Sequence, residues 1–251
     1  MSRNICKKII LKSASIAIFA VLFYTSCDDN SVNVVTPEVT TFEDKRDGKI
    51  YKKVQIGSQI WMAENLRYEA DGSSCYGEGG KGTMNIREPN PDGTPNSWII
   101  KTITLAEHCD IYGRLYDWPT AMNGEHSSNS VPSGIEGVCP VGWHVPSDAE
   151  WQTLIDYVGT NAGTKLKSRE WRGGGTGAGG VRILDGTDKY RFSALDGPLV
   201  SASVWWSSTE RESNEGTAWT RYIEIYNSSS NGVGRYDRDK HTAYSVRCVH
   251  D

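Results

Sequence analysis

The chain of 251 residues has a formal net charge of −4, with 37% hydrophobic and 23% charged residues. This acidic balance argues against nucleic acid or an anionic lipid surface as the partner. Nine tryptophans and twelve tyrosines stand against only four phenylalanines. Tryptophan and tyrosine combine a large apolar body with a polar group, so they suit shallow cores and binding surfaces equally.

Residues 1–26 have the layout of a secretory signal peptide. A basic start is followed by a mostly apolar run over residues 9–24 and by small residues before Cys27. The apolar run is interrupted by Lys12 and is too short to favour a membrane-spanning helix. Removal of this segment takes the formal net charge from −4 to −8, because it holds no acidic residue and four basic ones, Arg3, Lys7, Lys8 and Lys12.

The residues around Cys27 point to a lipid anchor. Thr25-Ser26-Cys27 resembles the site at which bacterial lipoproteins are cleaved and then lipidated on the cysteine. Asp28 and Asp29 resemble the acidic tag that sends lipoproteins of Bacteroidetes-type bacteria to the outer face of the outer membrane. We expect a lipid-anchored protein of the cell outer membrane, exposed at the surface, with residues 27–41 as a polar tether. A plain secreted protein with an incidental Cys27 is the alternative.

A β-hairpin is predicted at the start of the domain expected over residues 42–251. Apolar and polar residues alternate from Ile50 to Ile56, and Gly57-Ser58 forms a turn. The run Gln59–Ala63 then returns as the second strand.

Residues 67–108 carry the weakest structural signal. Glycines and three prolines break every periodic run except Trp98–Leu105, which alternates like a strand. We expect a loop insertion over 67–108, either a disulfide-clamped functional loop or disordered decoration.

The central helix has the clearest start signal. Ser147 and Glu150 have the spacing of a capping box, in which each side chain satisfies a backbone N–H of the first turn. The helix is expected to begin at Ser147 and to end near Gly159. Its buried stripe is formed by apolar residues three and four apart, Trp151, Leu154, Ile155 and Val158.

Other elements are shorter. Helices are expected at Tyr112–Met122, with Pro119 in the first turn, and at Ala162–Ser168. The glycine run over 172–180 contains G-x-G-x-x-G, but no strand precedes it, so it indicates a flexible loop rather than a dinucleotide site. Alternation predicts strands in the last third, at Tyr190–Leu195, Ser203–Thr209, Ala218–Tyr226 and Ala243–Val249.

Four cysteines remain in the expected domain. An even number in an oxidising compartment predicts two disulfides, and sequence alone allows three pairings. We favour Cys75–Cys109, which closes the irregular segment, and Cys139–Cys248, which ties the entry of the central helix to the end of the domain. A metal site is the competing interpretation, but no two of these cysteines have the close spacing of a zinc knuckle.

Several separated motifs occur in one order: Asp47-Gly48, Val54–Gly57, Gln59–Leu66, Tyr112–Tyr116, Cys139-Pro140, Gly142–Pro146, Trp206–Ser208 and Val246–Val249. Together they resemble the Fibrobacter succinogenes major paralogous domain, from about residue 42 to the end. This resemblance implies a secreted or lipid-anchored bacterial surface protein. It also implies an α+β, C-type-lectin-like fold with an N-terminal β-hairpin, two helical regions and a mainly antiparallel C-terminal sheet.

The segment His144–Trp151 is also similar to formylglycine-generating-enzyme-like domains, which share that fold. Fold and catalysis must be separated, because those enzymes depend on a reactive cysteine pair late in the domain. Here the late region holds only Cys248. We therefore expect no enzyme, and we expect His144 to be a packed, hydrogen-bonded residue. A degenerate enzyme of the formylglycine type, or a glycan-active one, stays as an alternative.

No cofactor is expected. Glu88-Pro89-Asn90 matches the tripeptide with which sugar-binding C-type lectins hold calcium, but it precedes the central helix and lacks the usual partner motif. Acidic loops at Asp237-Arg238-Asp239 and Asn90-Pro91-Asp92 offer oxygen ligands for calcium, although neither has a full set.

The C-terminal stretch Tyr222–Tyr244 is the best candidate for a binding surface. It is rich in Tyr, Asn, Ser, Gly, Arg and Asp, the composition of antibody-like contact surfaces. It is similar to the ligand-facing region of C-type-lectin-like proteins diversified by retroelements. The alternative is that Asn227–Gly234 is a solvated hairpin tip.

We therefore expect a non-catalytic surface lipoprotein that binds an extracellular glycan or protein and no nucleic acid. The expected contact residues are aromatic, polar and charged: Trp205, Trp206, Trp219, Tyr222, Tyr226, Asn227, Arg235, Tyr236, Asp237 and His241. A structural or pilus-associated surface component is the rival hypothesis.

Overall fold

The computed structural model describes residues 36–76, 83–89, 98–169, 186–195, 202–224 and 231–251. Residues 36–251 form one compact unit. This unit is α+β with mostly antiparallel strands, as predicted. The expected signal peptide, Cys27 and the glycine run lie outside the described residues. Within the described part of the chain, no helix is long and apolar enough to cross a membrane.

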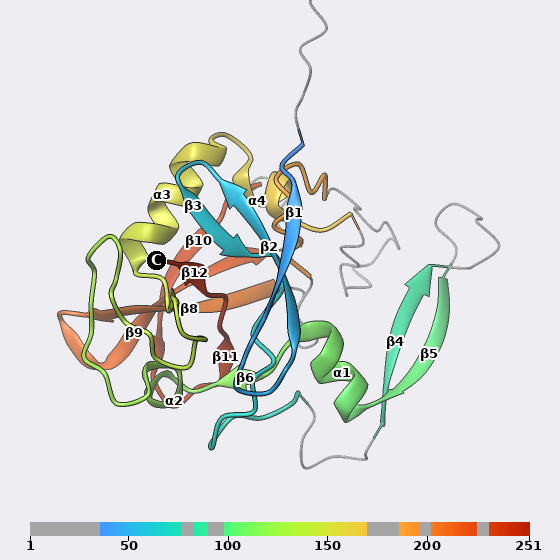
Figure 1. The fold of residues 1–251 in the computed structure, drawn as a ribbon, viewed down its shortest axis with the longest axis horizontal. Coiled ribbons are helices and arrows are strands. Elements are labelled where there is room, and N and C mark those ends of the chain that lie inside the picture. Colours follow the sequence, from blue (N-terminus) through green and yellow to red (C-terminus); the bar gives the residue numbers. More distant parts are fainter. Residues whose placement is uncertain (1–35, 77–82, 90–97, 170–185, 196–201, 225–230) are drawn as a thin grey trace, which may run out of the picture. The chain divides into compact units, whose positions relative to one another are not determined.

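The predicted hairpin is confirmed in a first sheet of five strands (Figure 1). Their spatial order is β1 (Val39–Glu43), β2 (Ile50–Ile56), β3 (Gln59–Met62), β12 (Val249–His250) and β7 (Trp143–His144). The turn between β2 and β3 needs Gly57, because its φ is +63° and a Cβ there would lie 2.9 Å from the ring of Tyr157. Residues 39–41, expected in the tether, pair with β2 instead.

The second sheet gathers the C-terminal strands. Its spatial order is β10 (Gly234–Asp239), β9 (Asn214–Glu224), β8 (Ala202–Arg211), β11 (Tyr244–Ser245) and β6 (Leu115–Tyr116). All of its pairs are antiparallel except β11 with β8. The strand predicted at Tyr190–Leu195 is wrong, because that segment makes only an isolated bridge at Ala194.

The central helix forms as predicted. In α3 (Asp148–Val158) the Ser147 side chain accepts from the Glu150 N–H, and the Glu150 side chain accepts from the Ser147 N–H. Most of the predicted stripe is buried, while Ile155 is partly buried. α3 contacts β8 and β9 (Figure 1) and is followed by α4 (Ala162–Leu166).

The expected loop insertion over 67–108 contains regular structure. A two-stranded sheet of β4 (Thr83–Pro89) and β5 (Trp98–Thr104) leads into α1 (Leu105–Tyr112). Thr104 and Glu107 form a capping box at the start of α1. The helix predicted at Tyr112–Met122 is shorter, because β6 intervenes and α2 spans only Trp118–Met122.

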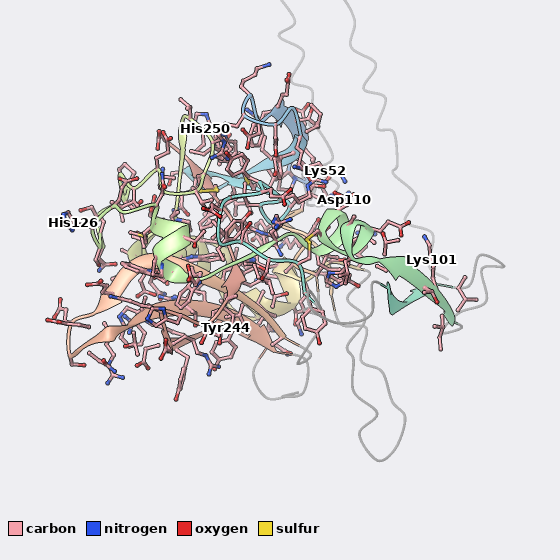
Figure 2. The ribbon with its side chains drawn as sticks, turned by 90° about the horizontal axis from the view of Figure 1, so that it is seen from below. Lys52, Lys101, Asp110, His126, Tyr244 and His250 are labelled. Carbon is pink, nitrogen blue, oxygen red and sulfur yellow. A yellow bond between two sulfur atoms is a disulfide. The ribbon has the colours of Figure 1, made fainter. Side chains whose placement is uncertain are left out.

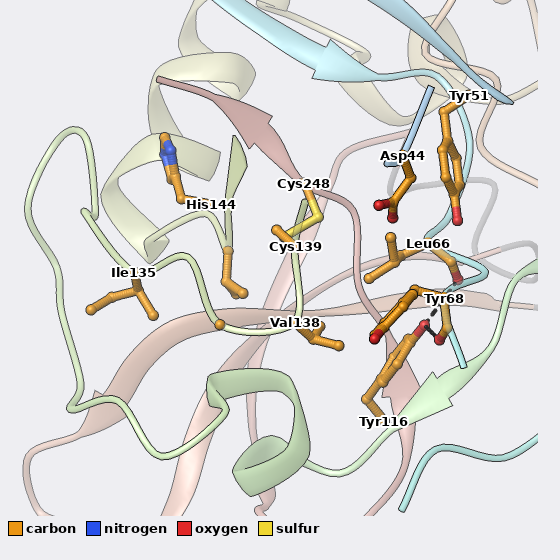
Figure 3. The surroundings of a disulfide bond; sticks show 12 residues. Asp44, Tyr51, Leu66, Tyr68, Tyr116, Ile135, Val138, Cys139, His144 and Cys248 are labelled. Atoms are coloured by element: carbon orange, nitrogen blue, oxygen red, sulfur yellow. Dashed lines mark hydrogen bonds between the residues drawn. A yellow bond between two sulfur atoms is a disulfide. The ribbon is translucent and has the colours of Figure 1, made fainter. Parts of the chain in front are cut away.

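Both predicted disulfides are present. Cys75–Cys109 joins the segment after β3 to α1, with the Cα atoms 5.6 Å apart. Cys139–Cys248 joins the segment before β7 to the residue just before β12, with the Cα atoms 6.0 Å apart (Figure 3). Beside it, the Tyr116 hydroxyl donates to the Tyr68 carbonyl over 2.6 Å. Cys139 and Cys248 are both buried members of a hydrophobic core cluster, so the second disulfide is part of the core.

Candidate functional site

The predicted contact residues divide between the two faces of the second sheet. Directly paired residues of antiparallel strands share a face, and β9 pairs Trp219 with Asp237 and Arg221 with Arg235. These four side chains therefore lie on one face, which we call the α3-side face because Arg221 and Arg235 both contact Asp148 of α3. Tyr236 pairs with Thr220 and lies on the opposite face.

Trp205 and Trp206 were expected to contact a ligand, and the structure corrects this. Both are fully buried, so their rings have no accessible surface to offer. They are neighbours on a strand, so their rings point to opposite faces of β8 and enter the two separate core clusters. The indole N–H of Trp205 donates to Asn65 Oδ1 over 2.8 Å, and that of Trp206 donates to the Tyr116 carbonyl over 2.8 Å.

The other expected contact residues are dispersed. Tyr226 and Asn227 lie outside the described residues. His241 is exposed in the turn after β10, where its backbone N–H donates to Asp239 Oδ1 over 2.8 Å. The Tyr222 ring lies over Gly234, where a Cβ would stand only 2.2 Å from it. The Tyr222 ring therefore packs on the start of β10.

Asp148 is the anchor of the α3-side face. It is 8% exposed, and its two oxygens accept from two arginines. Oδ1 lies 2.7 Å from Nε of Arg221, which is 4% exposed, and Oδ2 lies 2.8 Å from Nε of Arg235. Arg221 also donates to Gln152 Oε1 over 3.2 Å. One carboxylate on the first turn of α3 therefore fixes side chains of both β9 and β10.

Two arginines lie near the Trp219 ring. The guanidinium carbon of Arg235 is 3.4 Å from the centre of the Trp219 ring, and that of Arg211 is 5.8 Å from it. Arg211 Nη1 also donates to Asp237 Oδ2 over 2.6 Å. That hydrogen bond is the main reason why the pKa of Asp237 is lowered. Ion pairs thus hold cations beside a half-buried indole, an arrangement that is electrostatically favourable.

A depression of about 450 Å³ adjoins this array, between the first turns of α3 and the strands. Asp148, Gln152, Arg221 and Arg235 line it, together with Asn129, Ala149, Thr153 and Asp156. Figure 2 shows the second sheet from below, with the labelled Tyr244 among its many polar side chains. The α3-side face therefore combines an aromatic ring, fixed charges and a concave surface.

Residues 54–250 match the family described as the Fibrobacter succinogenes major domain. The chain belongs to this family. The match confirms the resemblance seen in the sequence, and it extends from within β2 to β12, so the whole α3-side face is part of the Fibrobacter succinogenes major domain. No curated protein and no solved structure matches the chain.

Several residues of this face were missed by sequence reasoning. Asp148, Gln152 and Arg221 lie outside the predicted contact set, because their partnership depends on how α3 packs on β9. Arg211 also lies outside it, because its ion pair with Asp237 depends on how β8, β9 and β10 pair. The only local signal was the position of Asp148 in the first turn of a capped helix, where a carboxylate is favourable.

His144 of the Fibrobacter succinogenes major domain is buried and hydrogen-bonded, as expected. Its Nε2 lies 2.8 Å from Glu150 Oε1, and its Nδ1 lies 2.5 Å from Asp251 Oδ1. Burial acts to lower the pKa of His144, but the hydrogen bonds with the two carboxylates outweigh it, so the pKa is raised. Both ring nitrogens therefore face carboxylates, and neither faces a hydroxyl nucleophile.

Among the described residues, no group of three or more His, Cys, Asp or Glu side chains is arranged so that it could hold a metal ion. The acidic loop considered for calcium has other roles, since Asp237 pairs with Arg211 and Asp239 accepts from the His241 N–H. The tripeptide Glu88-Pro89-Asn90 ends outside the described residues, as does Asn90-Pro91-Asp92.

Proposed function

We propose that this Fibrobacter succinogenes major domain protein is a non-catalytic, lipid-anchored protein of the outer membrane surface. It adopts a C-type-lectin-like fold, binds an extracellular glycan or protein, and needs no cofactor. The contact surface is the α3-side face around Trp219. The observation that carries this proposal is the half-buried Trp219 with the guanidinium groups of Arg235 and Arg211 near its ring, beside a depression of about 450 Å³ that Arg235 lines.

The composition of this face supports binding of a macromolecule. Tryptophan and arginine dominate the energetics of protein interfaces, and aromatic rings also stack on the apolar faces of sugars. The arginines are already positioned by Asp148 and Asp237, so less side-chain entropy is lost when a ligand binds. Preorganised side chains give more affinity for the same contact area.

The absence of catalysis is supported by the cysteines and by His144. The four cysteines of the described domain are paired in two disulfides, so formylglycine-type chemistry lacks its reactive thiol among them. His144 is engaged by two carboxylates. A thiol reagent should therefore find none of these four cysteines reactive in the native protein, and reaction at Cys248 would favour the enzyme hypothesis.

The proposal is tested with a glycan and host-protein array, screened with the full chain and with single variants. Trp219→Ala should abolish binding, whereas Tyr236→Ala should retain it, because Tyr236 lies on the opposite face of the sheet. Tyr157→Ala is a control that removes another exposed tyrosine and should also retain binding. Tyr157 lies on α3 and is 58% exposed, close to the 53% of Tyr236. A chelator should have no effect. Loss with Tyr236→Ala but not with Trp219→Ala would contradict the assignment.

A structural or pilus-associated role is the second candidate, and the β4–β5 ribbon favours it. Both strands have only one partner among the described strands, and Ile99 and Ile100 of β5 are 40% and 70% exposed. Unpaired strand edges and exposed apolar residues favour assembly. In this case sedimentation should show oligomers that Ile100→Lys disperses, and array binding should be absent.

A further inference from the structure

A polar cavity lies away from the α3-side face, between β2, α1 and the segment 186–195. It has a volume of about 350 Å³, within the range of small-molecule sites. Its polar lining includes Lys52, Glu64, Asp188, Arg191 and Arg247. A second depression of about 410 Å³ shares Lys52, Asp188 and Arg191 with it, so the cavity continues outward. Figure 2 labels Lys52, whose side chain is 62% exposed at the rim.

The buried end of the cavity is formed by Arg247, which is 1% exposed. Its guanidinium lies over the Phe192 ring at 4.3 Å and donates to Asn65 Oδ1 through Nε over 3.0 Å and Nη2 over 2.7 Å. Nη1 donates to the Phe192 carbonyl. These acceptors are uncharged. Burial lowers the pKa of Arg247 to about 9, although the charges of Glu64 and Asp188 act to raise it. Within the described residues, no carboxylate forms a salt bridge with this cation.

A guanidinium has five N–H donors, and the acceptors named above take three of them. One N–H on each terminal nitrogen is left over. Buried cations are costly unless they are paired and hydrogen-bonded, so this end of the cavity favours an anion.

The carboxylates of the cavity are already anchored by their own neighbours. Glu64 Oε2 accepts from the Lys52 backbone N–H over 2.8 Å. Asp188 accepts from the Ser193 N–H over 2.8 Å and from the Ser193 hydroxyl over 3.0 Å. Four cations line the cavity, namely Lys52, Arg169, Arg191 and Arg247, against these two carboxylates. The surplus charge is positive in a chain whose net charge is negative.

We propose that this cavity binds a sugar that carries a carboxylate, such as a uronic acid. The sugar's carboxylate lies against Arg247 and Arg191, and its hydroxyls donate to the unused lone pairs of Glu64 and Asp188. The volume exceeds that of a simple anion, and the anchored carboxylates suit hydroxyl donors rather than a second negative group. The site is separate from the α3-side face and does not depend on the function proposed for it.

The test is isothermal titration calorimetry of the full chain with glucuronate and with glucose, its neutral counterpart. Glucuronate should bind at least about ten-fold more tightly than glucose, because charge-assisted hydrogen bonds are the stronger kind. Its affinity should fall as salt is added.

Arg191→Asn is the decisive variant. It removes the charge, and asparagine tolerates the φ of +57° at this position. It should weaken glucuronate binding about ten-fold, whereas the exposed control Arg238→Gln and the Trp219→Ala variant should bind as the wild type does. Equal binding of glucose and glucuronate, no glucuronate binding, or unchanged affinity in Arg191→Asn would overturn the proposal.

Discussion

Asp148 forms ion pairs with two arginines of different exposure, and this predicts two different coupling energies. The pair with Arg221 is buried, with side-chain exposures of 5% and 11%. The pair with Arg235 is open to solvent on one side, because the Arg235 side chain is 42% exposed. Removing one partner of a buried pair leaves an uncompensated charge, whereas solvent screens an exposed pair.

The magnitudes follow from this difference. Asp148→Asn should destabilise the fold by about 3 kcal/mol, at the lower end for a buried pair. Gln152 still accepts from Arg221 in that variant, which limits the loss. The coupling energy between Asp148 and Arg221 should be about 2 kcal/mol or more, and that between Asp148 and Arg235 should be below about 1 kcal/mol.

The assay is urea unfolding of two double-mutant cycles, which combine Asp148→Asn with Arg221→Met and with Arg235→Met. Each cycle isolates one pair, and the shared Asp148→Asn variant makes the two directly comparable. Array binding of Asp148→Asn should also weaken, since Arg235 is no longer held over Trp219. Equal couplings, or a larger one for Arg235, would refute the reasoning from burial.

Two further predictions concern stability. Replacing both cysteines of Cys139–Cys248 by alanine should lower the free energy of unfolding by about 5 kcal/mol, and replacing those of Cys75–Cys109 should lower it by about 4 kcal/mol. The first loss is larger because that disulfide closes the longer loop, with a sequence separation of 109 residues against 34. Urea unfolding measures both losses, and a larger loss for the shorter loop contradicts this order. The raised pKa of His144 means that its bonds to two carboxylates stabilise the fold fully below its ordinary pKa of 6.5. That contribution is lost as pH rises through the folded-state pKa, so the stability advantage over His144→Gln should shrink toward alkaline pH, and a constant or growing advantage would be the opposite result.

Local signals in the sequence predicted the elements that depend on local chemistry. The capping box of Ser147 and Glu150 gave the start of α3, and the Gly57-Ser58 turn gave the first hairpin. The same signal was present at Thr104 and Glu107, but the glycine-rich and proline-rich surroundings of residues 67–108 concealed it. Cysteine count and position were enough to favour the observed disulfide pairing.

The candidate site depended on packing that local patterns do not contain. Trp205 and Trp206 were expected at a binding surface, yet both are fully buried. The neighbouring Ser207 and Ser208 are buried too, and their hydroxyls donate to the backbone carbonyls of Trp219 and Ser128. β8 is central in its sheet and has a core cluster on each face. Polar side chains on it are therefore buried, and they hydrogen-bond to backbone carbonyls rather than to solvent.

The pairing register of β9 and β10 could not be predicted from the sequence either. It decides that Trp219 and Asp237 share a face while Tyr236 lies on the other. A shift of one residue would exchange the two faces, and composition alone does not distinguish the two registers. The predicted contact set therefore contains residues of both faces of the sheet.

The most direct test of the central claim is hydroxyl-radical footprinting of the full chain, with and without the ligand that the array identifies. Oxidation of Trp219 should fall when the ligand is bound, while oxidation of Tyr236 and Tyr157 should not change. Protection of Tyr236 with no protection of Trp219 would show that the ligand contacts the opposite face of the second sheet.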